Sequence, residues 1–90
     1  MHWEYEFAPA AFRELAKLDK QTQRAIIRYL DERLSVCDDP RNFGHALAHE
    51  LSGYWRWRVA NYRIIGEIFE SKLLITVIKI GHRSKIYERR

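Results

Sequence analysis

The chain has 90 residues, of which 47% are hydrophobic and 31% charged, and its formal net charge is +4. A chain of this length forms a single domain, 1–90, and can bury only about two-thirds of its unfolded surface, so one two-layer core is the most it can build. The composition is too apolar and too aromatic for an intrinsically disordered chain.

The cysteine content and the apolar runs indicate the cellular setting. The single cysteine, Cys37, cannot form an internal disulfide, and no Cys/His spacing typical of a metal site is present. The start, MHWEYEF, has acidic residues where a signal peptide has basic and apolar ones. The longest wholly apolar run, LLITVI, is far shorter than the roughly 20 residues that span a bilayer. We therefore expect a cytoplasmic protein with no membrane association, no metal and no cofactor.

Positive charge is concentrated in the second part of the chain. Residues 1–50 contain seven Lys/Arg and nine Asp/Glu, a balance of −2, whereas residues 51–90 contain nine and three, a balance of +6. Such an asymmetry favours a polyanion or an acidic protein as partner. The alternative is an ordinary solvated basic surface.

The first elements are a strand and two helices. Residues 2–7 alternate and are aromatic, which predicts a strand. Pro9 suits the first turn of a helix, where its missing N–H is not needed. Asp19 is the expected cap of a second helix over 20–36, whose apolar stripe is Ile26, Leu30 and Leu34. The short connection between the helices predicts an αα-hairpin.

Three strands are predicted after an irregular segment. CDDPRNFG, residues 37–44, contains two structure breakers, and HALAHEL after it fits either a short helical turn or a loop. The strands cover 54–60, 62–70 and 73–80, joined at 60–61 and 71–72, and Asn61 is suited to the left-handed conformation that tight turns need. Residues 81–90 form a basic tail with no clear period.

The order β-α-α-β-β-β predicts an α+β fold: a four-stranded antiparallel sheet with the αα-hairpin packed on one face. Two helices cover only one face of such a sheet. The other face must meet water or a partner.

Alternation along the predicted strand 54–60 sorts its side chains between these faces. Trp55 and Trp57 share one face, and Arg56 and Arg58 share the other, about 7 Å apart. Arg63 lies just past the turn, where it can approach Arg58. Further candidates at the same end of the sheet are Lys79, His82, Arg83, Lys85 and Tyr87.

These residue types limit the chemistry. A carboxylate pair, a Gly-rich phosphate loop and a nucleophile with a matched base are all missing from this half of the chain. Guanidinium groups match phosphate oxygens and stay charged, and aromatic side chains stack on nucleobases. The pattern predicts a phosphate-rich ligand but does not by itself predict an enzyme.

The stretch LSGYWRWRVANYRII, followed by LLITVIKIGHRSKIY, resembles the RelE/ParE superfamily of type II toxin–antitoxin toxins. The resemblance covers the whole chain in length, element order and the L-x-G-x-x-R-x-R, YR-I and G-H-R patterns. It implies a cognate antitoxin as partner and one of two targets. RelE toxins cleave messenger RNA on the ribosome, whereas ParE toxins poison DNA gyrase without known nuclease chemistry.

Two features favour the RelE branch. Arg56 and Arg58 match the basic pair of RelE toxins, and Arg83 with Tyr87 match the arginine and tyrosine of their active site. The resemblance then implies a metal-free ribosome-dependent endoribonuclease, in which the RNA 2′-OH attacks its own 3′-phosphate. A ParE-like gyrase poison is the alternative.

The resemblance also implies roles for individual residues. The implied catalytic residues are Arg58, Arg63, Arg83 and Tyr87. Arg58 and Arg63 would bind the phosphate, and Arg83 would stabilise the leaving oxygen. Tyr87 would stack on a base or orient the 2′-OH. The implied RNA-binding residues are Arg56, Lys79, His82, Lys85 and His45. Three simpler roles are alternatives: a surface charge for Arg63, an ion pair with Glu67 for Arg56, and packing of the tail for Tyr87.

The chain also departs from the family pattern. The basic pair is all arginine here, whereas the best-known RelE toxin has lysines, and arginine is a poor general base. Many relatives have an acidic residue where this chain has Asn61, and a Lys or Glu after the glycine where it has His45. The general base is therefore open, with the imidazoles of His45 and His82 as candidates because histidine titrates near neutral pH.

Overall fold

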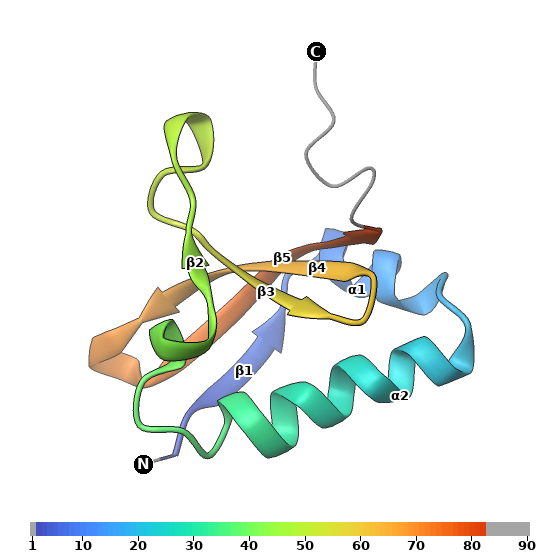
Figure 1. The fold of residues 1–90 in the computed structure, drawn as a ribbon, viewed down its shortest axis with the longest axis horizontal. Coiled ribbons are helices and arrows are strands. Elements are labelled where there is room, and N and C mark those ends of the chain that lie inside the picture. Colours follow the sequence, from blue (N-terminus) through green and yellow to red (C-terminus); the bar gives the residue numbers. More distant parts are fainter. Residues whose placement is uncertain (1, 83–90) are drawn as a thin grey trace.

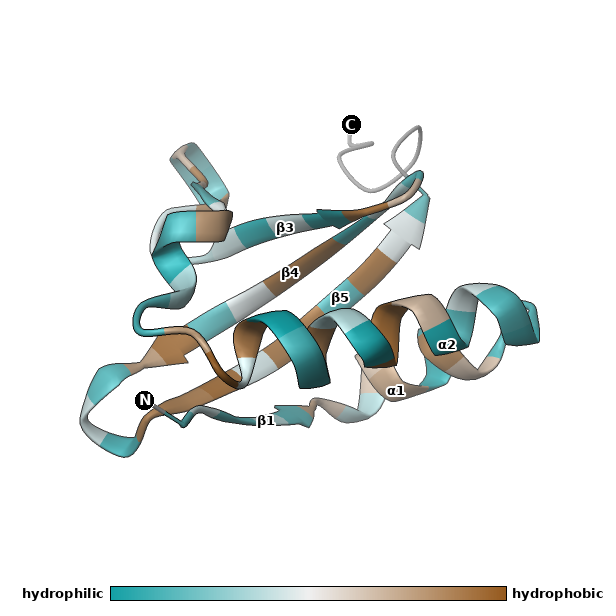
Figure 2. Cartoon of the chain, turned by 60° about the horizontal axis from the view of Figure 1, so that its bottom comes forward, coloured by the Kyte–Doolittle hydropathy of each residue, from teal (hydrophilic) through white to brown (hydrophobic). Residues whose placement is uncertain are grey.

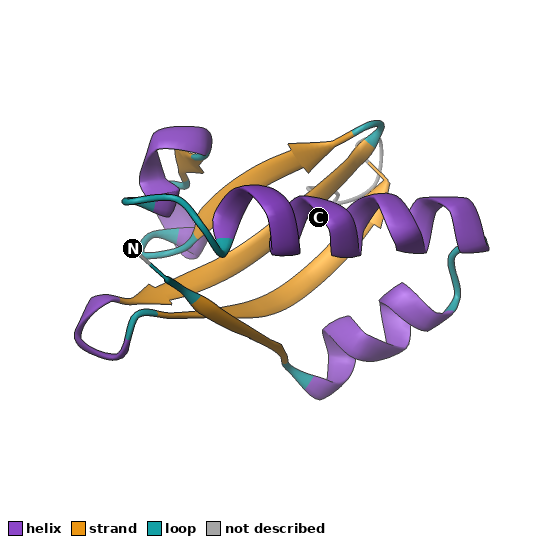
Figure 3. Cartoon of the chain, turned by 90° about the horizontal axis from the view of Figure 1, so that it is seen from below, coloured by secondary structure: helices purple, strands orange, loops and turns teal. Residues whose placement is uncertain are grey.

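A five-stranded sheet and two helices form the two layers of the molecule, which we describe from a computed structural model over residues 2–82. Both helices lie on the same face of the sheet (Figures 1 and 3). This arrangement confirms the predicted α+β class with an αα-hairpin on one face. The elements are β1 (Glu4–Phe7), α1 (Pro9–Ala16), α2 (Lys20–Tyr29), β2 (His45–Ala46), β3 (Trp55–Val59), β4 (Tyr62–Phe69) and β5 (Leu74–His82).

Side chains at the helix ends hold the αα-hairpin together. The Asp19 carboxylate accepts hydrogen bonds from the hydroxyl of Thr22 at 2.6 Å and from its backbone N–H at 3.3 Å, and these bonds lower the pKa of Asp19. The Gln23 amide donates to the carbonyls of Leu15 at 3.1 Å and Leu18 at 3.0 Å, where α1 has run out of intrahelical donors. The predicted cap is confirmed. Together these hydrogen bonds fix the connection between the two helices.

The predicted helix over 20–36 changes pitch part of the way along. α2 ends at Tyr29, and a π-helical turn over Leu30–Leu34 follows, closed by a hydrogen bond from Ser35 N–H to the carbonyl of Leu30 at 2.9 Å. Leu30 and Leu34 are both fully buried. The predicted apolar stripe is therefore confirmed, although the segment is not one regular helix.

The sheet order is β1-β5-β4-β3-β2, and two predictions about it are wrong. The sheet has five strands rather than four, because His45–Ala46 pairs with β3; two exposed residues are too short to show an alternating pattern. The sheet is also mixed, because β1 runs parallel to β5 while the other pairs are antiparallel. The direction of the first strand depends on how the hairpin crosses the sheet, which local patterns do not encode.

The turns between the last strands also differ from the prediction. The left-handed residue in the β3–β4 turn is Ala60, with a φ of 55°, and not Asn61. The β4–β5 connection contains a 3-10 turn over Glu70–Lys72 and places Leu73 at a φ of 50°. β5 continues to His82, two residues beyond the predicted end.

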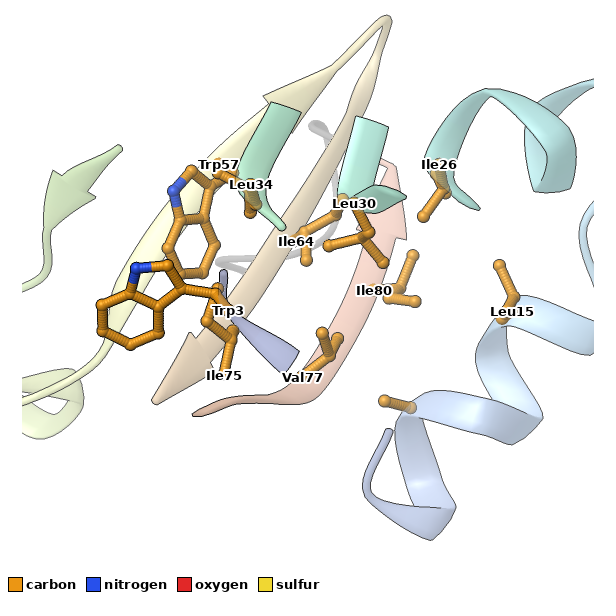
Figure 4. Packing of buried hydrophobic residues seen from close by; sticks show 11 residues of the cluster. Trp3, Leu15, Ile26, Leu30, Leu34, Trp57, Ile64, Ile75, Val77 and Ile80 are labelled. Carbon is orange, nitrogen blue, oxygen red and sulfur yellow. The ribbon is translucent and has the colours of Figure 1, made fainter. Parts of the chain in front are cut away.

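The core lies between the sheet and the helices (Figure 4). Along β4 and β5, hydrophobic stretches alternate with hydrophilic ones (Figure 2), as expected for a sheet with one covered face. Trp3 and Trp57 are almost fully buried, and their indole N–H groups donate to the carbonyls of Asp38 at 3.2 Å and Pro40 at 3.0 Å. The other core side chains include Leu15, Ile26, Leu30, Leu34, Ile64, Ile75, Val77 and Ile80.

Gly44 brings the segment before β2 close to β3. A Cβ at this position would lie 2.8 Å from the indole nitrogen of Trp57 and 2.9 Å from the carbonyl oxygen of Arg56. Only glycine permits this approach without a shift of the backbone. As a result, His45 enters the sheet directly beside Arg56.

A helix side chain completes the edge of β5. The β1–β5 pairing ends at Phe7 and Val77, so the residues after Val77 have no neighbouring strand on that side among those described. There the Glu14 carboxylate accepts a hydrogen bond from the backbone N–H of Ile80 at 2.7 Å. Its second oxygen lies 3.9 Å from the ammonium of Lys79.

Candidate functional site

The open face of the sheet gathers basic side chains from three adjacent strands. In the β3–β4 pairing Arg58 lies directly opposite Arg63, and in the β2–β3 pairing His45 lies directly opposite Arg56. Directly opposite residues of antiparallel strands point to the same face. Since Trp57 points into the core, these four side chains lie on the other side of the sheet.

These side chains line a cavity of about 330 Å³, which we call the arginine cavity. Its lining residues are Phe43, His45, Arg56, Arg58 and Arg63. None of them is acidic. The cavity therefore presents three guanidinium groups and an imidazole without a carboxylate to neutralise them, which suits an anionic ligand.

Arg63 has the least ordinary environment in the cavity. Its Nε and Nη1 atoms are buried and have no hydrogen-bond partner among the described residues. Buried donors without an acceptor cost free energy, and guanidinium groups do not lose their charge. A guanidinium group donates readily to phosphate or carboxylate oxygens, so anionic oxygens bound in the cavity could provide the acceptors that Arg63 lacks there.

The ion pair considered for Arg56 does not form within residues 2–82. Arg56 faces Ile65 in the pairing of β3 with β4, whereas Glu67 lies further along β4, opposite Thr76 of β5. Arg56 instead lines the arginine cavity.

Two other predicted RNA-binding residues lie away from the arginine cavity. Lys79 is 48% exposed and lies beside Glu14 of α1. Because Gly81 is opposite Arg63, alternation turns His82 to the other face, where its ring meets that of Tyr62 edge-on at 5.5 Å between centroids. The structure therefore brings His45, Arg56, Arg58 and Arg63 together, but not Lys79 and His82. Three further candidates, Arg83, Lys85 and Tyr87, lie outside the described residues.

An arginine outside the cavity provides a contrast. Arg41 lies 2.9 Å from both Asp39 and Glu70. Burial lowers the pKa of Arg41, but the hydrogen bonds and charges of Glu70 and Asp39 outweigh this effect, and the pKa is raised. Arg41 is neutralised within the fold, whereas the cavity arginines form no ion pair with a carboxylate of residues 2–82.

A second, more apolar cavity of about 530 Å³ borders the first, and we call it the apolar groove. Val36 is 60% exposed and Phe43 is 42% exposed, so two large apolar side chains lie open there. Burial raises the pKa of the Cys37 thiol and of the Tyr29 phenol, so neither ionises readily and Cys37 is not an activated nucleophile. The lining residues are Ala25, Arg28, Tyr29, Glu32, Arg33, Val36, Cys37, Phe43 and Val59.

Phe43 lines both cavities, although it is not among the site residues predicted from the sequence. The available signal was its place in the segment CDDPRNFG, directly before a glycine, because a large aromatic in an irregular segment has no strand or helix face to bury it.

Neither a metal cluster nor a membrane-spanning helix is found in the part of the chain that the structure describes. In residues 2–82 no three His, Cys, Asp or Glu side chains gather closely enough to hold a metal ion. No helix there is both long and apolar enough to cross a bilayer.

A mixed sheet with a helical hairpin on one face and a basic cavity on the other defines a small α+β protein of the RelE/ParE type. A family model described as the ParE toxin of type II toxin-antitoxin system, parDE, matches residues 5–87. The chain therefore belongs to this family and is a toxin of a type II toxin–antitoxin system. The predicted membership of the RelE/ParE superfamily is confirmed.

Individual relatives agree with this assignment. Toxin RelG of Mycobacterium tuberculosis is 28% identical over 89 residues, which cover 99% of this chain and 100% of RelG. The RelBE2 toxin–antitoxin complex of the same organism matches with a TM-score of 0.84 at 25% identity, over 92% of this chain and 100% of the other. The intact RelBE complex of E. coli matches with a TM-score of 0.70 over 97% of this chain and 99% of the other; at 18% identity this likeness shows the fold alone.

Proposed function

We propose that this toxin is a metal-independent endoribonuclease that cleaves messenger RNA on the ribosome and thereby inhibits translation. The observation that supports it best is the arginine cavity, in which Arg63 has two buried donors without an acceptor in the described part of the chain. The likeness to RelG and to the RelBE2 complex also favours the RelE branch.

The reaction requires no group beyond the RNA and the protein. The 2′-oxygen of a ribose attacks the adjacent phosphorus, and the bond from phosphorus to the 5′-oxygen of the next nucleotide breaks. The products are a 2′,3′-cyclic phosphate and a free 5′-OH. The protein must align the attack, neutralise the charge that builds up on the phosphorane, take one proton from the 2′-OH and provide one to the leaving oxygen.

The cavity residues can be assigned to these tasks. Arg63 would hold the scissile phosphate through its guanidinium group, and Arg58, directly opposite, would share the charge of the phosphorane. Arg56 would bind a flanking phosphate. The roles proposed for Arg83 and Tyr87 stay as the resemblance implies them.

The position of His45 makes it the better candidate for the general base. Its ring lines the arginine cavity, whereas that of His82 packs against Tyr62 on the other face. We therefore propose that His45 accepts the proton of the 2′-OH and that His82 positions the end of β5. Lys79, with Lys85, would contribute to RNA binding.

The partners follow from this proposal. The ribosome and its message are the substrate, and the cytoplasm is the place of action. A cognate antitoxin, expected because the structural relatives are toxin–antitoxin complexes, would neutralise the toxin by covering the basic face. A flexible acidic segment that orders on binding fits both the charge of the arginine cavity and the apolar groove.

A second candidate function is supported by the family match. The matching family is that of the ParE toxin, and the cavity contains no lysine that could lose its proton. In this alternative the basic face binds DNA gyrase and no bond is broken.

Brief expression without an antitoxin separates the two functions. We expect protein synthesis to stop within minutes, with new messenger RNA 5′ ends inside codons that bear a 5′-OH. Expression of Arg63→Ala is the control and should give few such ends. The ribonuclease proposal fails if translation continues while gyrase cleavage complexes accumulate.

A further inference from the structure

The exposed ring of Phe43 stands between the arginine cavity and the apolar groove. We propose that Phe43 is the stacking platform for one nucleobase of the bound RNA, next to the phosphate held by Arg58 and Arg63. This inference rests on the proposed ribonuclease function and adds a base-binding subsite to it. The ring is 42% exposed although it is large and apolar, so the fold does not use it fully for its own core.

The backbone that presents Phe43 is anchored on both sides. Phe43 ends a 3-10 turn that starts at Pro40, whose carbonyl accepts the indole N–H of Trp57. The carboxylate of Asp39 caps this turn by accepting from the backbone N–H of Arg41 at 3.0 Å. On the other side, Gly44 lies against Trp57 so closely that no side chain fits. The backbone therefore holds the ring in a fixed position in which a ligand can reach it.

A second contact orients the ring itself. The guanidinium of Arg33 lies over it, 5.2 Å from the ring centroid, on the side of the apolar groove. A cation in this position is attracted to the π-electrons and restricts rotation of the ring. A flat ligand entering the arginine cavity would thus meet an aromatic surface that is already in place, and little conformational entropy would be lost on stacking.

The combination of charge and ring favours a nucleotide. Arg56, Arg58 and Arg63 provide the phosphate subsite, and an aromatic ring bordering the same cavity provides the base subsite. Proteins that bind single-stranded RNA join these two elements, because every base has a π-face and every linkage a charge. An apolar side chain of a protein partner would need the ring but not three guanidinium groups beside it.

Binding to programmed ribosomes tests this subsite without cleavage. The probe is a message whose codon in the ribosomal A site has deoxyribose in place of the nucleophilic ribose, and each base of that codon is replaced in turn by an abasic residue. For the parent toxin, removal of the stacked base should weaken binding by about tenfold or more, the scale of one base–aromatic stack. Removal of the other bases should have less effect.

Substitution of Phe43 should then remove this dependence on the base. Phe43→Leu keeps an apolar side chain without the ring, so it should bind the intact codon only as well as the parent binds the abasic one, with no further loss on the abasic codon. Phe43→Trp should keep the difference between the two codons. Phe12→Leu is the matched control, because Phe12 is also an exposed aromatic (58%) but packs near Phe7 of β1, at the opposite edge of the sheet.

Three outcomes would overturn the inference, and they are distinguishable. If Phe43→Leu weakens binding to intact and abasic codons by the same factor, the ring does not stack on the base. If RNA binding is unchanged and only antitoxin affinity falls, the ring belongs to the antitoxin contact. If the parent toxin neither binds nor cuts the A-site codon, the proposed function itself fails, and the subsite falls with it.

Discussion

The two faces of the sheet differ in whether their buried polar atoms have hydrogen-bond partners. On the face covered by the helices, buried polar atoms have partners, as the indole N–H groups of Trp3 and Trp57 illustrate. On the open face, the arginines of the arginine cavity lie side by side, and Arg63 keeps two buried nitrogens without an acceptor among the described residues. Adjacent residues of the same strand, Trp57 and Arg58, belong to these different environments.

This difference separates what stabilises the fold from what the fold is used for. Burying apolar side chains lowers the free energy of the folded state, and pairing the polar groups buried with them avoids a desolvation penalty. Clustering like charges without counterions raises it, so such a cluster is expected where an external anion completes the site. Mutations on the covered face should therefore lower the free energy of unfolding, whereas mutations on the open face should lower the cleavage rate.

The largest expected effect is on the covered face. Trp57→Ala should lower the free energy of unfolding by about 3–5 kcal/mol, because it removes a fully buried aromatic side chain and its bond to Pro40. Denaturant titration measures this change. Trp55→Ala is the control, since Trp55 only packs at the margin of the core, and its effect should be clearly smaller. Equal effects at both positions would contradict the assignment of Trp57 to the centre of the core.

The second effect separates activity from stability on the open face. Arg63→Ala should lower single-turnover cleavage on programmed ribosomes by about 10²-fold or more, the scale for losing one preorganised charge donor. Its stability should not fall, because the substitution removes two buried nitrogens that have no acceptor within residues 2–82. Arg13→Ala, an exposed arginine on α1, should leave both properties unchanged. If Arg63→Ala cleaves at the rate of the parent toxin, the active site does not include the arginine cavity.

A third experiment distinguishes the two histidines by the face on which they lie. His45→Gln should lower the cleavage rate by about 10²-fold, at the low end of the range for general acid–base catalysis. His82→Gln should cost only a few-fold, because its ring packs against Tyr62 outside the cavity. The same single-turnover assay decides between them. A larger loss from His82→Gln would reverse the assignment of the base.

The smallest effect tests polar pairing at the rim of the covered face. Tyr5 donates a hydrogen bond to Asp31, and burial together with this bond raises the pKa of Tyr5 to about 12. The raised pKa means that the stabilisation is fully present below about pH 10, the ordinary value for a tyrosine, and is lost as the pH rises through about 12. Tyr5→Phe should therefore lower stability by about 1 kcal/mol at pH 8.

The difference between Tyr5→Phe and the parent should shrink above pH 10, as measured by denaturant titration at several pH values. In a background of Asp31→Ala, Tyr5→Phe should have little effect, which isolates the pair. A constant difference up to pH 12 would show that the hydroxyl contributes only by packing.

Local patterns predicted the covered face well. The alternation of WRWRV and the spacing of Ile26, Leu30 and Leu34 are consequences of side-chain direction, which holds in any strand or helix. The same alternation also predicted that Arg56 and Arg58 share the open face. These features depend on neighbours in sequence and so could be inferred without a structure.

Features that depend on distant contacts could not be predicted. The strand His45–Ala46 exists because Gly44 fits against Trp57, and the parallel direction of β1 depends on the path of the helical hairpin. The position of Phe43 at the cavity is a further consequence of that fit. Lys79 and His82 follow the arginines in the chain, yet neither lines the arginine cavity: Lys79 lies near a carboxylate of α1, and His82 lies against the ring of Tyr62.

The bond between Glu14 and the backbone of Ile80 also has a consequence for association. The unpaired edge of a β-strand is a template on which a second chain can add a strand, and such additions lead to aggregation. By taking the N–H of Ile80, a charged side chain from α1 closes part of β5 that β1 does not reach. A second chain that approached this edge would therefore find one backbone donor fewer to pair with.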